Sequence, residues 1–339
     1  MKALVLHAVG DLRYEDIPQP ELTPGSVRVR VAFCGVCGSD IPRIFVKGTY
    51  HFPTVCGHEF AGTVEAVAPG AAGFSPGDRV AVFPLLWCGQ CAACADQKYV
   101  QCEDYDYYGS RRDGAFAEYV VVPPRNLMKV PAGVSLEEAA MTEPAAVARH
   151  ALRRVADRLD GRSVLIFGAG PIGLMAAQWA RAMGARAVAL SDPIARKLEL
   201  ARELGFVTSA PADGADVVVD AAGAPPALLA AMRAARRGGA VVLLGNPSGD
   251  LTLPAALWSQ LMRREVALYG TWNSDYGVAG DRDDWRAALE AMASGRLRLR
   301  PLISHTVPLA DGIAALQMMR DGREFFSKVM IRPAPGSDP

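Results

Sequence analysis

The sequence lacks an excess of charge of either sign, because 36 lysines and arginines balance 36 aspartates and glutamates. Nucleic-acid-binding proteins usually carry a basic excess, so the composition favours other partners. A long apolar run is also missing: three glycines and one proline interrupt residues 164–177, the best candidate. A bilayer span needs about 20 consecutive apolar residues. We therefore expect a cytoplasmic protein with no membrane segment and no nucleic-acid partner.

The seven cysteines do not form the even set of a short disulfide scaffold. Four of them fall within 15 residues, at Cys88, Cys91, Cys94 and Cys102. In a reducing compartment such a cluster indicates a metal site or catalysis. Half of the 339 residues are hydrophobic, which favours well-packed cores, and the length predicts two domains at about 150 residues each.

The first part of the chain is predicted to be an antiparallel β domain. Short alternating segments separated by Gly and Pro turns are typical of half-buried strands. The expected strands cover residues 2–7, 26–32, 62–68, 79–83 and 117–122. Ser135 and Glu138 then have the spacing of a capping box, which predicts a helix start.

From residue 163, strand-like and helix-like segments alternate, which predicts a parallel sheet with crossover helices. The expected strands are 163–168, 187–191, 216–220 and 239–245, and the expected helices are 171–184, 194–204 and 225–236. The tail has helix-like 286–294 and 310–320 and strand-like 302–307 and 327–332. It does not extend this series, so we expect it to pack on the first domain. The predicted division is 1–145, 146–285 and a returning segment, 286–339.

The strand at 163–168 leads into a G-x-G-x-x-G loop that predicts dinucleotide binding. Gly168 permits the tight turn, Gly170 lets the backbone approach a pyrophosphate, and Gly173 lets the helix pack on its strand. Asp192 follows Gly173 by 19 residues, where its carboxylate can accept from both ribose hydroxyls and repel a 2′-phosphate. Lys197 can reach the ribose edge. This context favours NAD over NADP, and over a Gly-rich turn in an unrelated α/β protein.

The cysteine cluster has the spacing of a closed metal site. Four thiolates complete a tetrahedron around zinc and leave no open position, as in a structural site. An iron–sulfur cluster is the alternative, because ferredoxins also contain Cx₂Cx₂C. The spacing of the fourth cysteine favours zinc.

A second set of residues has the ligand types of an open, catalytic zinc site. Cys37, His58, Glu59 and Glu143 lie at the ends of expected strands or just before the nucleotide domain. A thiolate, an imidazole and a carboxylate leave the fourth position to water or substrate. Each residue also has a structural interpretation: a small buried Cys37, a core His58, or an acid at a helix start in Glu143. Cys34 and Cys56 are assigned to packing.

Taken together, these motifs resemble the medium-chain zinc-dependent dehydrogenase family. The resemblance rests on Cys37-Gly-Ser-Asp40, Gly57-His-Glu59, the four-cysteine cluster, Gly77-Asp-Arg-Val80 and the Gly168–Gly173 loop. It extends from Lys2 to about Arg332 and implies a GroES-like catalytic domain beside a Rossmann domain. A carboxylate at Glu143, where many alcohol dehydrogenases have a second cysteine, resembles the polyol branch. The resemblance implies two zinc ions per chain, NAD, and a polyol or polyol phosphate as substrate.

The resemblance also implies a mechanism and its residues. Zinc would lower the pKa of the substrate hydroxyl, and hydride would pass to nicotinamide in the cleft between the domains. The family commonly has a relay histidine where this chain has Pro42, so Ser39 is expected to accept the proton. The expected cofactor residues are Gly168, Gly170, Pro171, Ile172, Gly173, Asp192, Lys197, Gly245, Thr271 and Trp272.

A phosphorylated substrate requires cations, and four are candidates: Arg43, Lys47, Arg111 and Arg112. The competing interpretation is that they are solvated surface charges. The sequence is also compatible with a dehydrogenase of an unphosphorylated polyol, amino-cyclitol or threonine, with a zinc-ribbon nucleic-acid binder, and with a dehydrogenase-like protein without activity. We expect a homodimer or homotetramer, with residues 239–245 and 263–271 as candidate pairing segments.

Overall fold

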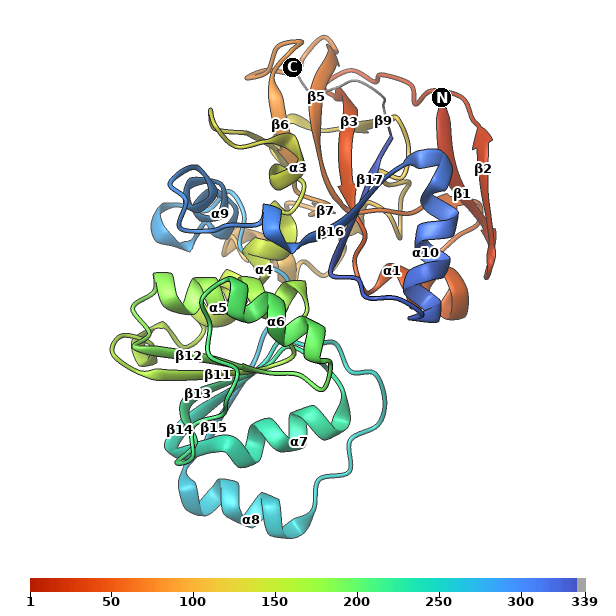
Figure 1. Cartoon of the computed structure of the whole chain (residues 1–339). Coiled ribbons are helices and arrows are strands. Elements are labelled where there is room, and N and C mark those ends of the chain that lie inside the picture. Colours follow the sequence, from red (N-terminus) through yellow and green to blue (C-terminus); the bar gives the residue numbers. More distant parts are fainter. Residues whose placement is uncertain (334–339) are drawn as a thin grey trace. The chain divides into compact units, whose positions relative to one another are not determined.

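The computed structural model describes residues 1–333, and the chain divides into two compact units (Figure 1). The first unit comprises Met1–Glu143, Asp275–Ala293 and the described chain from Leu299 onward. The second comprises Pro144–Ser274 and Ser294–Arg298. The boundaries expected at 145 and 285 differ from this division mainly over residues 275–285, which belong to the first unit. Within residues 1–333 no helix is long and apolar enough to cross a membrane.

The first unit is built mainly from antiparallel strands. They are β1 (Lys2–Ala8), β2 (Asp11–Asp16), β3 (Val27–Gly35), β4 (Thr54–Val55), β5 (Glu59–Val67), β6 (Arg79–Val82), β7 (Leu85–Leu86), β8 (Asp106–Tyr107), β9 (Tyr119–Val122), β10 (Leu127–Lys129), β16 (Ile303–Pro308) and β17 (Lys328–Arg332). The helices are α1 (Asp40–Pro42), α2 (Ala92–Ala95), α3 (Leu136–Ala139), α9 (Asp284–Ala293) and α10 (Gly312–Asp321). The largest sheet has the order β10-β6-β5-β3-β17-β16, and β9 pairs with β3.

Strand β3 shows why this unit folds as a sheet. Val27, Val29 and Val31 are buried, while Arg28 and Arg30 between them are half-buried. This alternation places the apolar side chains in one core. Near the end of the unit's first segment, the Ser135 hydroxyl accepts from the Glu138 N–H (3.2 Å), which confirms the predicted helix start.

The C-terminal segment from Leu299 onward lies in the first unit. Strand β17 pairs antiparallel with β3, with Met330 opposite Gly35 and Ile331 opposite Cys34. Strand β3 pairs with β5 on its other side, where Gly35 lies opposite Glu59. Residues from three distant parts of the sequence therefore meet at one end of this sheet.

The second unit contains a five-stranded parallel sheet of order β12-β11-β13-β14-β15. Its strands are β11 (Ser163–Phe167), β12 (Ala187–Ser191), β13 (Ala215–Asp220), β14 (Ala235–Leu243) and β15 (Ala267–Gly270). Its helices are α5 (Pro171–Ala182), α6 (Ala195–Glu203), α7 (Pro225–Ala234) and α8 (Ala255–Arg264), and α4 (Thr142–Arg153) contains the boundary between the units. The predicted fold class, an antiparallel β domain and a Rossmann-type parallel sheet, is confirmed.

Candidate functional site

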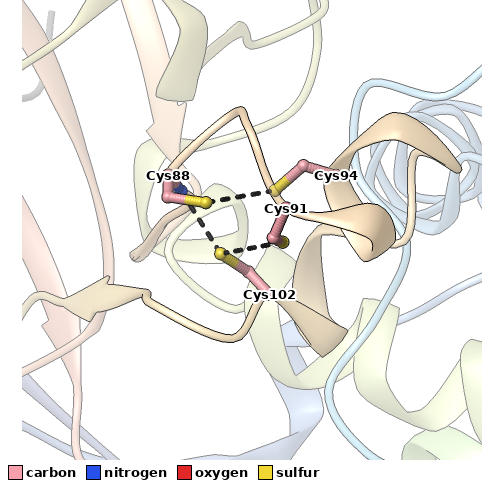
Figure 2. Close-up of side chains that lie close together, drawn as sticks. All are labelled: Cys88, Cys91, Cys94 and Cys102. Carbon is pink, nitrogen blue, oxygen red and sulfur yellow. Dashed lines mark hydrogen bonds between the residues drawn. The ribbon is translucent and has the colours of Figure 1, made fainter.

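The four clustered cysteines converge into one compact group (Figure 2). Their sulfurs all lie within 4.8 Å of one another. The Sγ atoms of Cys88 and Cys94 are 3.9 Å apart, as are those of Cys91 and Cys102. A tetrahedron of thiolates with Zn–S of about 2.3 Å has edges of about 3.8 Å. The arrangement therefore fits a zinc ion.

The surroundings of these thiols also favour a cation. Backbone N–H groups of Glu103 and Cys94 lower the pKa of Cys91 to about 6. Burial raises the pKa of Cys94 to about 12 and also raises that of Cys102. Buried thiols ionise when a positive charge lies beside them, and a bound metal ion supplies that charge.

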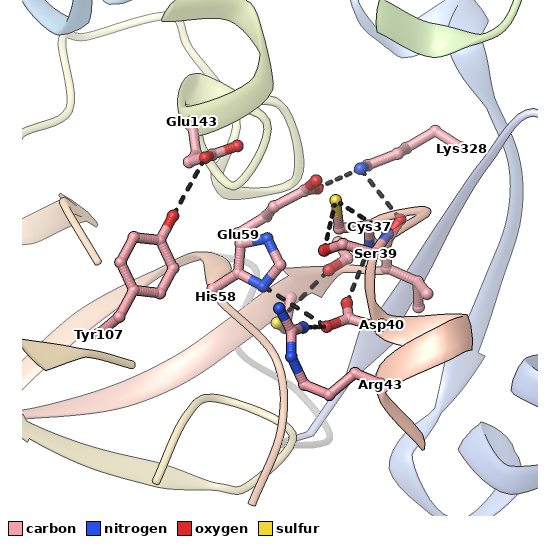
Figure 3. Close-up of polar contacts among 12 residues, drawn as sticks. Cys37, Ser39, Asp40, Arg43, His58, Glu59, Tyr107, Glu143 and Lys328 are labelled. Atoms are coloured by element: carbon pink, nitrogen blue, oxygen red, sulfur yellow. Dashed lines mark hydrogen bonds and ion pairs between the residues drawn. The ribbon is translucent and has the colours of Figure 1, made fainter. Parts of the chain in front are cut away.

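A second group contains Cys37, His58 and Glu59 (Figure 3). Cys37 follows β3, and His58 and Glu59 lie at the start of β5, which pairs with β3. One ligand atom from each residue lies within 4.8 Å of the other two. His58 and Glu59 are buried, and Cys37 is half-buried. Three mixed ligands of this kind fit a zinc ion with one open position.

Asp40, in α1, lies directly behind His58. Its Oδ1 is 3.5 Å from His58 Nδ1, a buried atom with no hydrogen-bond partner in the described chain. Burial lowers the pKa of His58, but the Asp40 carboxylate outweighs this effect and the pKa lies well above its usual range. With Nδ1 facing the carboxylate, the other ring nitrogen is the one available to a metal, as in carboxylate–histidine–zinc sites.

Glu59 forms a buried ion pair with Lys328 from β17. The Lys328 ammonium also donates to the Val36 carbonyl (3.1 Å). A side chain at Gly35 would overlap both Glu59 Oε2 and Lys328 Cε, so the glycine leaves room for this ion pair. The pair engages Oε2 of the Glu59 carboxylate and so restricts its orientation.

Glu143 lies outside this three-residue group. It is buried, and its Oε1 accepts from the Tyr107 hydroxyl (3.4 Å). Burial raises the pKa of the Glu143 carboxyl to about 7. The tyrosine ring also contacts His58 edge-on, with centroids 5.8 Å apart. The sequence left open which glutamate joins Cys37 and His58, and the geometry places Glu59 there.

The remaining residues expected in the catalytic unit have different surroundings. The Ser39 hydroxyl donates to Cys37 Sγ (3.2 Å), so it lies beside the metal-ligand group. Cys34 and Cys56 are fully buried in the core, as predicted.

The four candidate cations for a phosphate are not equivalent. Arg43 Nη1 is 2.5 Å from Asp40 Oδ1, and Arg112 Nε is 2.7 Å from Asp106 Oδ2. Lys47 is exposed at the end of a short π-helix, Arg43–Lys47. Arg111 stacks against aromatic rings. Because Asp40 in turn faces His58, the Arg43–Asp40 pair helps to orient the His58 ring.

In the second unit, the glycine loop has the geometry that its motif predicts. Gly168 has φ +102°, a conformation that favours glycine. A side chain at Gly173 would overlap the Gly168 carbonyl, whereas one at Gly170 would meet no atom within 4 Å. Pro171 and Ile172 begin α5, whose N-cap is Gly170. Open space in front of a helix N-terminus fits a pyrophosphate.

The other expected cofactor residues belong to the same unit. Asp192 follows β12, the neighbour of β11, and its carboxylate accepts from the N–H groups of Ala169 (2.8 Å) and Ile194 (2.9 Å). Gly245 N–H donates to the Asp220 carbonyl (2.7 Å). Thr271 Oγ1 is buried without a hydrogen-bond partner in the described chain, and the Trp272 side chain is exposed. An unpaired buried hydroxyl fits a polar group of a bound ligand.

Sequence reasoning assigned no role to Asp40, Tyr107 and Lys328. Lys328 carried a usable signal, because it begins the apolar strand Val329-Met-Ile331 and a lysine is seldom fully buried. Tyr107 had no signal, since its contact with Glu143 joins residues 36 positions apart.

Two family models match the chain. The alcohol dehydrogenase GroES-like domain matches residues 23–132, and the zinc-binding dehydrogenase domain matches residues 171–294. The chain is 36% identical over 321 residues to galactitol 1-phosphate 5-dehydrogenase of Escherichia coli K12, covering 90% of this chain and 92% of that enzyme. It is 31% identical over 343 residues to L-threonine 3-dehydrogenase of Yersinia pestis, covering 95% and 97%.

Solved structures agree with these matches. The crystal structure of the E. coli galactitol-1-phosphate dehydrogenase superposes with a TM-score of 0.91 at 35% identity, covering 98% of this chain and all of that one. A Sinorhizobium meliloti zinc-binding dehydrogenase bound to NADP gives 0.88 at 28% identity, covering 98% and 99%. The chain therefore belongs to the medium-chain zinc-dependent dehydrogenases, a family of oxidoreductases.

Proposed function

We propose that this protein oxidises a secondary hydroxyl of a polyol phosphate of the galactitol 1-phosphate type, with NAD⁺ as hydride acceptor. The observation that carries the proposal is the group of half-buried Cys37 and buried His58 and Glu59, whose mixed ligands fit a zinc ion with one open position. The similarity to galactitol 1-phosphate 5-dehydrogenase over 92% of that enzyme supports the substrate class.

The residues of the chain divide the work of this reaction. Cys37, His58 and Glu59 hold zinc, which when bound acts as a Lewis acid that lowers the pKa of the substrate hydroxyl. Asp40 and Arg43 orient His58, and Lys328 orients Glu59. Ser39 lies beside the Cys37 sulfur and would accept the hydroxyl proton while it passes its own proton to water, because Pro42 has no proton to exchange. Cys88, Cys91, Cys94 and Cys102 hold a second, structural zinc.

The second unit binds the dinucleotide in this proposal. The Gly168–Gly173 loop holds the pyrophosphate, Asp192 binds the adenosine ribose, and Lys197 and Gly245 flank that site. Thr271 and Trp272 frame the nicotinamide. A carboxylate at Asp192 would repel a 2′-phosphate, so NAD is preferred over NADP.

An NAD⁺-reduction screen at 340 nm tests the function. Galactitol 1-phosphate, sorbitol, an amino-cyclitol and threonine are supplied in turn, with and without a zinc chelator. We expect chelator-sensitive reduction, fastest with galactitol 1-phosphate. Threonine as the best substrate would instead support a threonine dehydrogenase. This is the second candidate function because the chain is 31% identical to that enzyme. No reduction with any of them would refute the proposal.

We also propose a homodimer or homotetramer in the cytoplasm. Strand β15 is the edge of its sheet, and Leu268 on it is exposed, as are Trp258 and Met262 on α8. The other candidate segment, 239–245, includes most of β14, which already pairs with β13 and β15. Light scattering coupled to gel filtration tests the assembly, and Leu268→Arg is expected to dissociate it.

A further inference from the structure

One arginine of the first unit has no ion-pair partner among the described residues. Arg43 and Arg112 pair with aspartates, but within residues 1–333 no carboxylate pairs with the Arg111 guanidinium. Lys47 is exposed, and no side chain of the described residues fixes its position. Of the four candidate cations, only Arg111 is both half-buried and without an ion-pair partner among the described residues.

Two tyrosines hold the Arg111 side chain in place. The guanidinium carbon lies 4.2 Å from the centroid of the Tyr50 ring and 4.6 Å from that of Tyr105. His51 Nε2 donates to the Arg111 carbonyl (3.1 Å) and fixes the backbone. Beside these cation–π contacts, the guanidinium N–H groups have no hydrogen-bond acceptor among residues 1–333 and so remain free to donate. A guanidinium fixed in this way is ready to bind an anion with two parallel hydrogen bonds.

A series of ring contacts connects Arg111 to the catalytic group. Tyr105 meets Tyr107 edge-on with centroids 6.5 Å apart, and Tyr107 meets His58 at 5.8 Å. The Tyr107 hydroxyl donates to Glu143. All of these residues belong to the first unit. Arg111 therefore lies in the same aromatic wall as His58 but two rings away from it.

We infer that Arg111 is the specificity-determining residue of this site and binds the phosphate of a polyol phosphate at the end remote from the reacting carbon. The inference rests on the proposed function. The separation of Arg111 from His58 favours a distant anion. In galactitol 1-phosphate, oxidation at carbon 5 occurs four carbons from the phosphate-bearing carbon. In threonine, oxidation at carbon 3 occurs only two carbons from the carboxylate carbon. A doubly charged phosphate also matches the guanidinium edge.

The test compares specificity ratios rather than single rates. For Arg111→Gln, kcat/KM for galactitol 1-phosphate divided by that for galactitol is expected to fall about 10- to 100-fold, the loss of one charge-assisted contact. The ratio for Arg111→Lys is expected to fall less, because lysine keeps the positive charge but lacks the two parallel N–H donors of the guanidinium. Arg125→Gln is the matched control, since Arg125 also stacks on an aromatic ring, Trp87, at 4.5 Å. Its ratio should equal that of the wild type.

Each different outcome counts against the inference. Equal losses on both substrates would make Arg111 a structural residue, and an unchanged ratio would overturn its role. A selective loss with threonine would show that it binds a carboxylate instead. If the wild type oxidises none of these compounds, the proposed function fails, and Arg111 is then judged by calorimetric titration of the zinc-loaded protein with galactitol 1-phosphate. Equal affinities of wild type and Arg111→Gln would overturn the inference independently.

Discussion

The two cysteine-containing groups of the first unit differ in what surrounds the sulfur atoms. The Cys88–Cys102 group has four thiols, and backbone N–H groups are their main polar neighbours. The Cys37 group has one thiol, and Asp40, Arg43, Glu143 and Lys328 surround it with buried or half-buried charge. A closed set of four ligands stabilises a lobe, whereas an open mixed set leaves a position for substrate and needs nearby charges to orient it.

Removing the catalytic thiol is expected to have the largest effect. Cys37→Ser should lower kcat/KM at least ~10³-fold, because Lewis-acid stabilisation supplies several kcal/mol. Metal analysis should show loss of one zinc per chain, with a melting temperature close to that of the wild type. Cys34→Ala, a buried cysteine outside both groups, should keep both zinc ions. A fully active Cys37→Ser enzyme would contradict the assignment of the Cys37 group as the catalytic zinc site, in contrast to the structural four-cysteine group.

Removing a thiol from the four-cysteine group should act on stability instead. Cys94→Ser is expected to lower the free energy of unfolding by about 3 kcal/mol or more, because loss of a structural metal is among the most destabilising changes. Chemical denaturation measures this change. Cys56→Ala, which also removes a buried sulfur, should cost only about 1 kcal/mol. Equal costs for the two variants would mean that the group holds no structural metal.

The raised pKa of Glu143 predicts a pH dependence for the chelator-treated protein. A carboxyl with a higher pKa in the folded state binds more protons when folded, so the free energy of unfolding falls as pH rises. The fall should occur between about pH 4.5 and the Glu143 pKa of about 7. The total decrease in the free energy of unfolding should be at most about 3 kcal/mol. Denaturation at a series of pH values should show a flatter profile for Glu143→Gln than for the exposed control Glu21→Gln. Identical profiles for the two variants would show that the Glu143 carboxyl does not cause the pH dependence.

The support behind His58 should give the smallest effect. Asp40→Asn is expected to weaken zinc binding at the Cys37 group about 10- to 100-fold, the usual cost of losing a carboxylate behind a ligating histidine. Competition with a coloured chelator measures this affinity. Zinc in the four-cysteine group provides an internal control and should be retained. An unchanged zinc affinity of the Cys37 group would show that Asp40 does not orient His58.

Much of this molecule could be predicted because its signals are local. The loop Gly168–Gly173 and the cluster from Cys88 to Cys102 each occupy a short segment, and their spacing alone limits the possible geometries. The strand and helix alternation of the second unit was equally readable for its first four strands, which differ from the expected ones by a few residues at their ends. Helix α8 and strand β15 were not among the expected elements. The fold class and the family followed from these segments.

The arrangement around Cys37 could not be obtained in this way. Lys328 reaches Glu59 only because β17 pairs with β3 after about 300 residues of intervening chain, and Gly35 leaves the room for that pair. Which of four arginine and lysine candidates remained free was decided by Asp40 and Asp106, whose pairing with Arg43 and Arg112 the sequence does not specify. The sequence by itself determined the ligand types and the dinucleotide loop, because both depend on local spacing. Only the tertiary structure decided which charges neutralise one another and which stay available to a substrate. The Glu59–Lys328 pair joins strands far apart in the chain, and the Arg43–Asp40 and Arg112–Asp106 pairs depend on side-chain orientations that short spacing alone leaves open.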